Sequence, residues 1–330
     1  MKTRQFIASA LVAAALSIGP ARAEFPERTI EVIYPWPPGA TMSVTQIIAK
    51  AVGEELGVSL AVISTPGAGG TKAFKTALSR PADGYTIFDG YVAPLVLQPI
   101  LGKADWTYKD FKPLHSAVSN AFAIGVRKGD PRWKTFTDLM EYGKANPGKL
   151  RYTTSTRNNL PHMVIAKVLQ TYGVVAQNVP YKTYGDATKD LASGVLDFAY
   201  INVAAYHQDK EAFEVFMVLS ELEGAKASFD GAPSITDLNV DLGLSGLAPM
   251  GWTWWLVRQE TPDAETEKLR AAMKAAMARE DIRAQLLKLG FVALDWGPED
   301  YDAIVGPVSD QLQAMDNALK WEEEQLKKLR

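Results

Sequence analysis

The residues best placed to do chemistry in this chain begin with a proline-rich loop, which reads YPWPPGATMS from Tyr34 to Ser43. Gly39 and Ala40 have almost no side chain, so the backbone N–H groups are accessible to a ligand where a helical pattern begins. The first N–H groups of a helix have no internal partner and lie at the positive end of its dipole. The loop therefore predicts a binding site for an anion, such as the carboxylate of a ligand.

The elements around this loop are those that such a site needs. Residues 30, 32 and 34 are apolar and alternate as in a strand, and apolar residues three and four apart predict a helix over 44–56. The expected ligand contacts are Trp36, Pro38, Gly39, Ala40, Thr41 and Ser43. The alternatives are a simple turn for the loop and a helix N-cap for Ser43.

A second glycine-rich turn, TPGAGG over 65–70, precedes a helix predicted over 71–79. A phosphate-binding loop would need a following Gly-Lys-Ser/Thr, and a dinucleotide loop would need wider glycine spacing. Neither pattern is present, so no nucleotide site is predicted. We interpret Gly69 instead as a close approach of backbone at the edge of a cleft.

A second group of polar side chains follows a strand predicted over 150–154. The hydroxyl groups of Thr154, Ser155 and Thr156 can donate to a carboxylate, and the planar fork of Arg157 suits the same partner. The alternative is an ordinary polar loop with a solvated arginine. We expect these four residues to form the second wall of the anion site.

Five further residues are predicted to line the same cleft: His162, Tyr181, Tyr184, Asn202 and Trp252. The alternatives are a structural role for the histidine and core packing for the tryptophans, although one or two indoles would suit a flat ligand. The three histidines of the chain show no H-x-x-x-H spacing, and the chain has no cysteine. We therefore predict no metal site, no cofactor and no thiol nucleophile.

The N-terminus has the pattern of an export signal. Lys2 and Arg4 precede an apolar run over 6–18, and the ARA triplet over 21–23 fits a cleavage site. We predict a signal peptide over 1–23 and a mature protein in the periplasm, without a lipid anchor because no cysteine is present. Loss of three cations with the signal would change the formal charge from −3 to −6, which gives no reason to expect nucleic acid as a partner.

The rest of the chain alternates strand and helix patterns, which is typical of α/β folds with helices on the faces of mostly parallel sheets. Two such blocks predict a two-lobed protein, with lobe 1 over 24–122 and 250–330 and lobe 2 over 123–249. A last helix from Pro298 is expected to pack on its own lobe and to end in a solvated tail. We expect a monomer.

Five short motifs occur in order along the chain: PWPPG over 35–39, PGAGG over 66–70, ADGYT over 82–86, ANPGKL over 145–150 and VPYK over 179–182. In order and spacing they resemble the periplasmic substrate-binding proteins of tripartite tricarboxylate transporters, the TctC or Bug family. The resemblance covers nearly the whole mature chain. It implies a type II periplasmic-binding-protein fold, or Venus flytrap, which closes on a small carboxylate and delivers it to the membrane subunits of a transporter without enzymatic chemistry.

Departures from the family pattern bear on the ligand. Ala40, Thr41 and Ser43 stand where the first loop of the family usually carries more glycine and an acidic residue, and Ile201 stands at another common acidic position. The missing carboxylates argue against an amino acid, and Arg157 argues for a second anionic group. A dicarboxylate or an aromatic carboxylate is therefore the expected ligand.

Two other functions stay open at this stage. A sensory binding protein that presents its ligand to a membrane receptor kinase would look the same in sequence, and neighbouring genes for membrane subunits would distinguish the two. A secreted hydrolase is the other alternative. The chain has no G-x-S-x-G elbow and no cysteine that could serve as its nucleophile.

Overall fold

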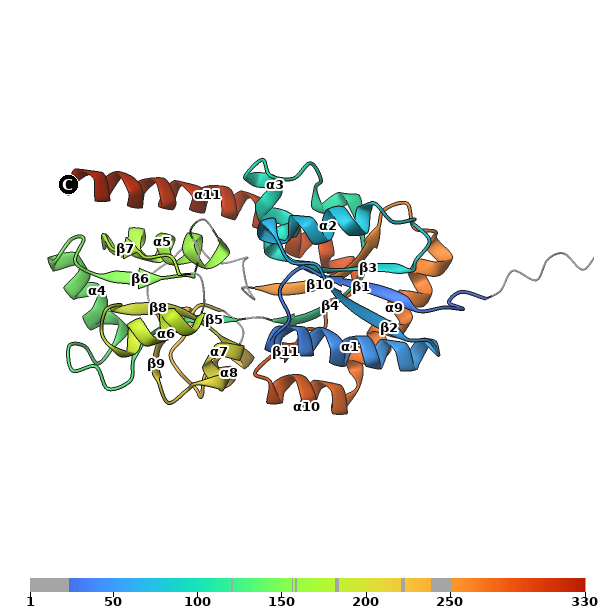
Figure 1. Ribbon diagram of the computed structural model, residues 1–330, viewed down its shortest axis with the longest axis horizontal. Coiled ribbons are helices and arrows are strands. Elements are labelled where there is room, and N and C mark those ends of the chain that lie inside the picture. Colours follow the sequence, from blue (N-terminus) through green and yellow to red (C-terminus); the bar gives the residue numbers. More distant parts are fainter. Residues whose placement is uncertain are drawn as a thin grey trace, which may run out of the picture.

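The computed structural model describes residues 24–119, 121–155, 157, 159–181, 184–220, 223–238 and 251–329. Figure 1 shows two lobes side by side, each built around one β-sheet with helices on its faces. The sheet of lobe 1 has six strands in the order β11-β4-β10-β3-β1-β2, and the sheet of lobe 2 has five in the order β7-β6-β8-β5-β9. The two-lobed α/β fold predicted from the sequence is confirmed.

The strands of lobe 1 are β1 (Ile30–Tyr34), β2 (Leu60–Ser64), β3 (Thr86–Tyr91), β4 (Phe111–Ser119), β10 (Trp252–Arg258) and β11 (Val292–Ala293). β1 pairs in parallel with β2 and β3, because a crossover helix follows each of the first two strands. β10 runs antiparallel to β3 and β4, and β11 runs antiparallel to β4. The sheet is thus mixed rather than mostly parallel, since the chain returns to it from lobe 2.

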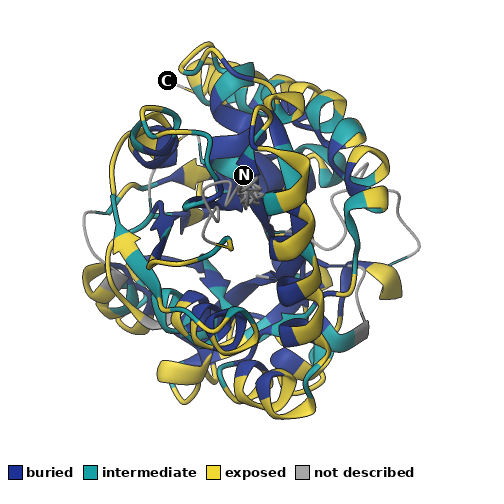
Figure 2. Cartoon of the chain, turned by 90° about the vertical axis from the view of Figure 1, so that its right-hand side faces the viewer, coloured by how far each residue is buried: buried dark blue, intermediate teal, exposed yellow. Residues whose placement is uncertain are grey.

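The helices of lobe 1 are α1 (Ala40–Leu56), α2 (Thr71–Leu78), the π-helical segment η2 (Ala93–Leu97), α3 (Gln98–Ile100), α9 (Asp263–Ala278) and α10 (Glu280–Lys288). Alternate strand residues point to opposite faces of the sheet. Val32 and Ile87 share a core with α1 and α9, whereas Ile33 and Phe88 share a core with α2 and η2. Figure 2 shows the result: the helix faces toward the sheets are buried, and the outward faces are exposed.

The sequence patterns do not predict β4, β11 or the segment from η2 to α3. β4 contains Pro113, which lacks the ladder donor and lies where the pairing with β10 shifts register between Trp255 and Leu256. His115 and Ser116 of the same strand are both buried, so the strand shows no alternation of apolar and polar residues. Packing inside the sheet, rather than local pattern, determines this strand.

The strands of lobe 2 are β5 (Phe122–Arg127), β6 (Arg151–Thr153), β7 (Gln177–Asn178), β8 (Phe198–Asn202) and β9 (Phe213–Val218), and its helices are α4 (Phe136–Ala145), α5 (Leu160–Tyr172), α6 (Tyr184–Ala192), α7 (Val203–Gln208) and α8 (Glu223–Ser228). β6 pairs in parallel with β7 and β8, while β5 runs antiparallel to β8 and β9. Thr135 caps α4: its hydroxyl accepts a hydrogen bond from the Asp138 N–H at 3.1 Å, and the Asp138 carboxylate accepts one from the Thr135 N–H at 3.1 Å.

Helix α11 (Tyr301–Lys328) corrects the prediction for the C-terminus. Tyr301 packs edge-on against Trp254 in lobe 1, with ring centroids 5.1 Å apart. The helix then runs along lobe 2 against α5, as Figure 1 shows. Its buried positions recur three and four residues apart as far as Glu322, so one continuous stripe packs first on one lobe and then on the other. The assignment of this helix to lobe 1 alone is therefore wrong.

Glu322 also contradicts the prediction of a solvated tail, because it is only 5% exposed. Its carboxylate accepts a hydrogen bond from the Tyr152 hydroxyl at 2.6 Å and lies 2.9 Å from His162 Nε2. In the described part of the chain no helix is long and apolar enough to cross a membrane. The segment predicted as a signal peptide, 1–23, lies outside the described residues.

Candidate functional site

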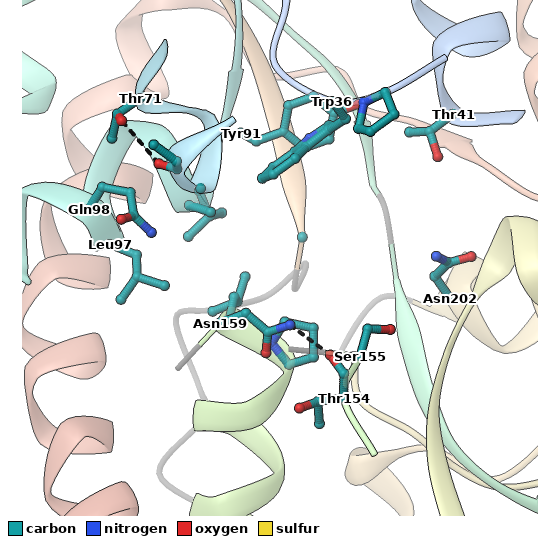
Figure 3. Close-up of a pocket in the computed structure, with 18 of the residues that line it drawn as sticks. Trp36, Thr41, Thr71, Tyr91, Leu97, Gln98, Thr154, Ser155, Asn159 and Asn202 are labelled. Atoms are coloured by element: carbon teal, nitrogen blue, oxygen red, sulfur yellow. Dashed lines mark hydrogen bonds between the residues drawn. The ribbon is translucent and has the colours of Figure 1, made fainter. Parts of the chain in front are cut away.

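A cavity of about 790 Å³ opens where the two lobes meet. Lobe 1 contributes the β1–α1 loop, the start of α2 and the segment from η2 to α3, and lobe 2 contributes the β6–α5 loop and the ends of β5 and β8. In Figure 3, Trp36, Tyr91 and Thr41 lie across the cavity from Thr154 and Ser155. Cavities of this size hold small organic molecules, and they are common between domains.

The first wall is the β1–α1 loop. It leads directly into α1, whose N-cap residue is Gly39. No side chain caps this helix, and the N–H groups of Met42 and Ser43 donate to the Gly39 carbonyl at 3.0 and 3.3 Å. Trp36, Gly39 and Thr41 line the cavity. An uncapped helix N-terminus thus lies at the cavity, as the predicted anion site requires.

Trp36 is an indole that lines the cavity. Its ring meets the ring of Tyr91 edge-on, with centroids 5.6 Å apart and an interplanar angle of 85°. Its carbonyl accepts a hydrogen bond from Ser64 Oγ at 2.8 Å, which ties the loop to β2. Trp252, which the sequence predicts as a ligand contact, is instead fully buried in the core of lobe 1, because β10 lies inside the sheet.

Gly69 lies at the edge of the cavity, where the chain turns into α2. Its φ angle is 64°, in the left-handed region, and a Cβ atom added to it would lie 2.6 Å from the amide nitrogen of Gln98. Gln98 also lines the cavity. The close approach interpreted from the sequence is therefore present, and it brings the backbone of the glycine-rich turn against the first residue of α3.

The second wall is the β6–α5 loop, which is held by its own hydrogen bonds. Asn178 Nδ2 donates to Thr154 Oγ1 at 3.0 Å, and Asn159 Nδ2 donates to the Thr154 carbonyl at 2.7 Å. Arg157 Nη2 donates to the Asn178 carbonyl at 2.9 Å. Ser155 has a φ angle of 65°, a conformation that costs a non-glycine residue roughly 1–3 kcal/mol and that is enriched at functional sites. The predicted residues of this loop that line the cavity are Thr154, Ser155 and Arg157.

Two predicted contacts are turned away from the cavity, because each has a partner within the body of the protein. His162 is buried and faces Glu322 of α11. The hydroxyl of Tyr181 donates to the carboxylate of Asp190 on α6 at 2.5 Å. Neither side chain is among the residues that line the cavity. The structural role weighed for His162 is therefore the one that the geometry supports.

The remaining predictions fall into three groups. Asn202 lines the cavity at the end of β8, where its side chain also caps α7 by accepting a hydrogen bond from the Ala205 N–H at 2.7 Å. Pro38 and Ser43 lie outside the lining, and Ser43 is not an N-cap because α1 begins earlier, after Gly39. The predictions for Thr156, Ala40 and Tyr184 concern residues or side chains that the structure does not describe.

The structure adds lining residues that the sequence did not predict, among them Tyr34, Lys75, Tyr91, Gln98, Lys103 and Asn159. Asn159 had a recognisable signal, since asparagine followed by a proline in the first helical turn is typical of an N-cap, and its side chain accepts from the His162 N–H at 2.9 Å. The others share no sequence motif. Only the tertiary fold brings them to one cavity.

The charge of the lining is positive. Lys75, Lys103 and Arg157 line the cavity, and no aspartate or glutamate does so among the described residues. No group of His, Asp and Glu side chains suited to a metal ion occurs in the part of the chain that the structure describes. The arrangement of cations, hydroxyls, amides and a helix N-terminus is suited to bind an anion.

A buried carboxyl group lies behind the first wall. Asp89 on β3 is 2% exposed, and Thr45 Oγ1 donates to its Oδ2 atom at 2.6 Å. Burial raises the pKa of Asp89 to about 7, because desolvation of the ionised form outweighs the hydrogen bond from Thr45. Burial and then the charge of Asp89 also raise the pKa values of Tyr34 and Tyr91, which line the cavity.

Comparison with known proteins decides the family. The model of the tripartite tricarboxylate transporter family receptor, TctC, matches residues 44–316. The chain belongs to the TctC family. The resemblance carried by the five sequence motifs is therefore confirmed, and the protein is a solute-binding receptor by family.

TctC relatives extend over most of the chain. A Cupriavidus necator protein, named UPF0065 protein in gbd 5'region, is 28% identical over 300 residues, which cover 87% of this chain and 89% of the relative. A TctC solute-binding protein from Polaromonas, solved without ligand, has a TM-score of 0.71 at 22% identity and covers 89% of this chain and 99% of its own. An R. palustris protein solved with adipate has a TM-score of 0.74 at 22% identity, and the match covers 89% of this chain and 98% of the R. palustris chain. The two structures share the fold of this protein.

Proposed function

We propose that this TctC receptor captures a small organic acid with two anionic groups and passes it, in the periplasm, to the membrane subunits of a tripartite tricarboxylate-type transporter. The observation that carries the proposal is the lining of the cavity, which has three cations and no described carboxylate. Such a lining favours negative charge on the ligand. The structural neighbour solved with adipate supports a dicarboxylate as the class.

The proposal assigns the two ends of such an acid to different parts of the cavity. The start of α1 and the hydroxyl groups of Thr154 and Ser155 are suited to one carboxylate, because both supply donors. Lys75 and Lys103 are suited to the second carboxylate. Trp36 lines the cavity, and its ring is suited to pack on an aromatic ring. The proposed ligands therefore include acids in which an aromatic ring separates the two carboxylates.

Ligand binding of this kind shifts the equilibrium between the open and closed states of the receptor. An acid that touches both walls makes its full set of contacts only when the lobes are closed, so it favours the closed state by its difference in affinity for the two states. The closed, loaded receptor would then differ in surface from the empty one. We infer that this difference is what the membrane subunits recognise.

A thermal-shift series over mono-, di-, tri- and aromatic carboxylates, with sugars and amino acids as controls, tests the ligand class. A matching acid at 100 times its dissociation constant should stabilise the protein by about 2.7 kcal/mol. Calorimetry then gives the affinity of each hit. Stabilisation by a sugar or a cationic amino acid, with no response to any acid, would contradict the proposal.

The position of the second carboxylate can be tested with Lys75→Gln combined with Lys103→Gln. Each lost ion pair costs roughly 0.5–1 kcal/mol at a partly exposed site, so the affinity for adipate should fall about tenfold. Hexanoate, which has the same carbon chain but one carboxylate, should bind the variant as it binds the wild type. Lys72→Gln is the matched control, because Lys72 is exposed on the same helix and does not line the cavity. An equal loss for both acids would contradict this placement.

A further inference from the structure

Asp89 has an unusual place for a carboxyl group, because it lies under the wall of a cavity suited to anions. β1 and β3 pair in parallel with Ile33 beside Phe88, so Tyr34 lies beside Asp89. Tyr91 follows two residues later on the same face of the sheet. These three side chains face α1, and Thr45 of α1 is in hydrogen-bond contact with Asp89.

Two tyrosines lie between Asp89 and the cavity. Tyr34 is beside Asp89 in the paired strands, Tyr91 follows Asp89 on the same strand, and both tyrosines line the cavity. Thr45 Oγ1 donates to the carboxylate at 2.6 Å from the side of α1. The enclosed carboxyl group is therefore next to residues of the ligand site.

The charged surroundings of Asp89 are sparse. β1 contributes Tyr34, β3 contributes Tyr91, α1 contributes the uncharged Thr45, and β10 places Trp255 opposite Asp89. Among the described residues no cation is paired with this carboxylate. Desolvation therefore dominates, and the pKa of Asp89 is raised to about 7, within the range in which a periplasmic protein works.

We propose that Asp89 is a proton-binding site coupled to the ligand site, so that an anionic ligand binds more tightly when Asp89 is protonated. The inference rests on the proposed function, because it assumes an anionic ligand. An ionised Asp89 places negative charge beside Tyr34 and Tyr91, which line the cavity, and this charge opposes the binding of an anion there. Protonation of Asp89 removes that charge, so the anion binds more tightly.

The coupling is reciprocal, because an anion that prefers protonated Asp89 must strengthen proton binding by the same factor. Near neutral pH the ligand is therefore expected to bind together with a proton from solution. At an effective dielectric constant of about 20, two unit charges within about 12 Å of each other interact strongly enough for a change of about tenfold in affinity. That is the size of the effect to look for between the two protonation states.

The test is calorimetry with adipate and with malate as probes at about pH 6 and about pH 8.5, on either side of the titration. The wild-type affinity should fall about tenfold at the higher pH. Asp89→Asn introduces a neutral residue of the same shape. At both pH values this variant should bind with the affinity that the wild type has at about pH 6. Asp105→Asn removes an exposed carboxylate that does not line the cavity and should behave as the wild type.

Titrations in buffers with different ionisation enthalpies measure the proton directly. The wild type should take up a proton on binding near pH 7, and Asp89→Asn should take up none. The same pH dependence in the wild type and in Asp89→Asn, or binding without proton uptake, would overturn the coupling while leaving the proposed function intact. If no acid binds at either pH, the proposed function and the coupling both fail.

A ligand-free measurement tests the proton site alone. The native state binds a proton at Asp89 that the unfolded state does not hold above about pH 4, so unfolding free energy should fall as pH rises toward about 7. Urea unfolding between about pH 5 and about pH 8 measures this free energy for the wild type and for Asp89→Asn. The free energy of the wild type should fall relative to that of Asp89→Asn as the pH rises. Parallel curves for the two proteins would show that Asp89 does not titrate there and would overturn the inference.

Discussion

Single residues shape the cavity through the backbone as much as through side chains. Gly69 and Ser155, on opposite walls, both have left-handed φ angles, 64° and 65°. Ser155 is held there because its N–H donates to Thr153 Oγ1 at 3.1 Å and its carbonyl accepts from the Tyr181 N–H at 2.8 Å. Both walls are therefore fixed before any ligand arrives, which lowers the entropy cost of binding.

Gly69→Ala tests this view at the residue scale. The added Cβ would meet the side chain of Gln98 at 2.6 Å in a left-handed position, whereas Gly102→Ala is equally left-handed, at 67°, but has nothing within 4 Å. We expect Gly102→Ala to cost roughly 1 kcal/mol of unfolding free energy and Gly69→Ala to cost roughly 1–3 kcal/mol. Adipate affinity should fall only in Gly69→Ala. Equal effects of the two variants on stability and binding would contradict the close approach at Gly69.

At the scale of elements, α11 is the connection that sequence reasoning placed wrongly. It begins on lobe 1 and ends on lobe 2, where Glu322 contacts Tyr152 of β6 and His162 of α5. β6 and α5 are the two elements that carry the second wall of the cavity. The last turns of α11 therefore stabilise the frame of the ligand site, although they contribute no lining residue.

Glu322→Ala should destabilise the protein strongly. It removes the acceptor of the Tyr152 hydroxyl and the partner of His162, both of which are buried, so the expected cost is roughly 2–4 kcal/mol of unfolding free energy. Glu324→Ala, at an exposed position of the same helix, should change it by less than about 0.5 kcal/mol. Urea unfolding measures both. A small effect of Glu322→Ala would show that α11 and lobe 2 associate without this contact.

Elements with a clear period could be predicted from the sequence, and those determined by packing could not. The helix after the proline loop follows from its apolar period. β4 could not be found because Pro113 and buried polar residues hide its alternation. The stripe of α11 was visible, but a stripe does not say which lobe it packs against.

The residues of the candidate site also fall into those with a local sequence signal and those without one. Gly39, Thr154 and Ser155 could be predicted as candidates, because glycines and hydroxyls in loops between strands and helices signal donors from their type alone. Their contact with a ligand stays a prediction. Lys75 and Tyr91 have no local signal, and they reach the cavity only because β1, β3 and α2 are placed together by the sheet.

At the scale of the whole molecule, two lobes that share one cavity are expected to close on their ligand. Small-angle X-ray scattering should show a smaller radius of gyration with saturating adipate than without it, because closure brings the two lobes together. Glucose at the same concentration is the control, since it offers no charge to the cationic lining. An unchanged profile with an acid that calorimetry shows to bind would mean that the ligand enters a receptor already closed.

The course of α11 across both lobes limits how they can move. A rotation that changes the angle between the lobes must flex this helix, whereas a twist about its long axis leaves it straight. Pro307, which lies inside α11 between the part on Trp254 and the part on β6, lacks the N–H that would complete the helical ladder. Flexing should therefore concentrate at that point, and the stiffness of one helix would set the range of openings that the receptor can sample.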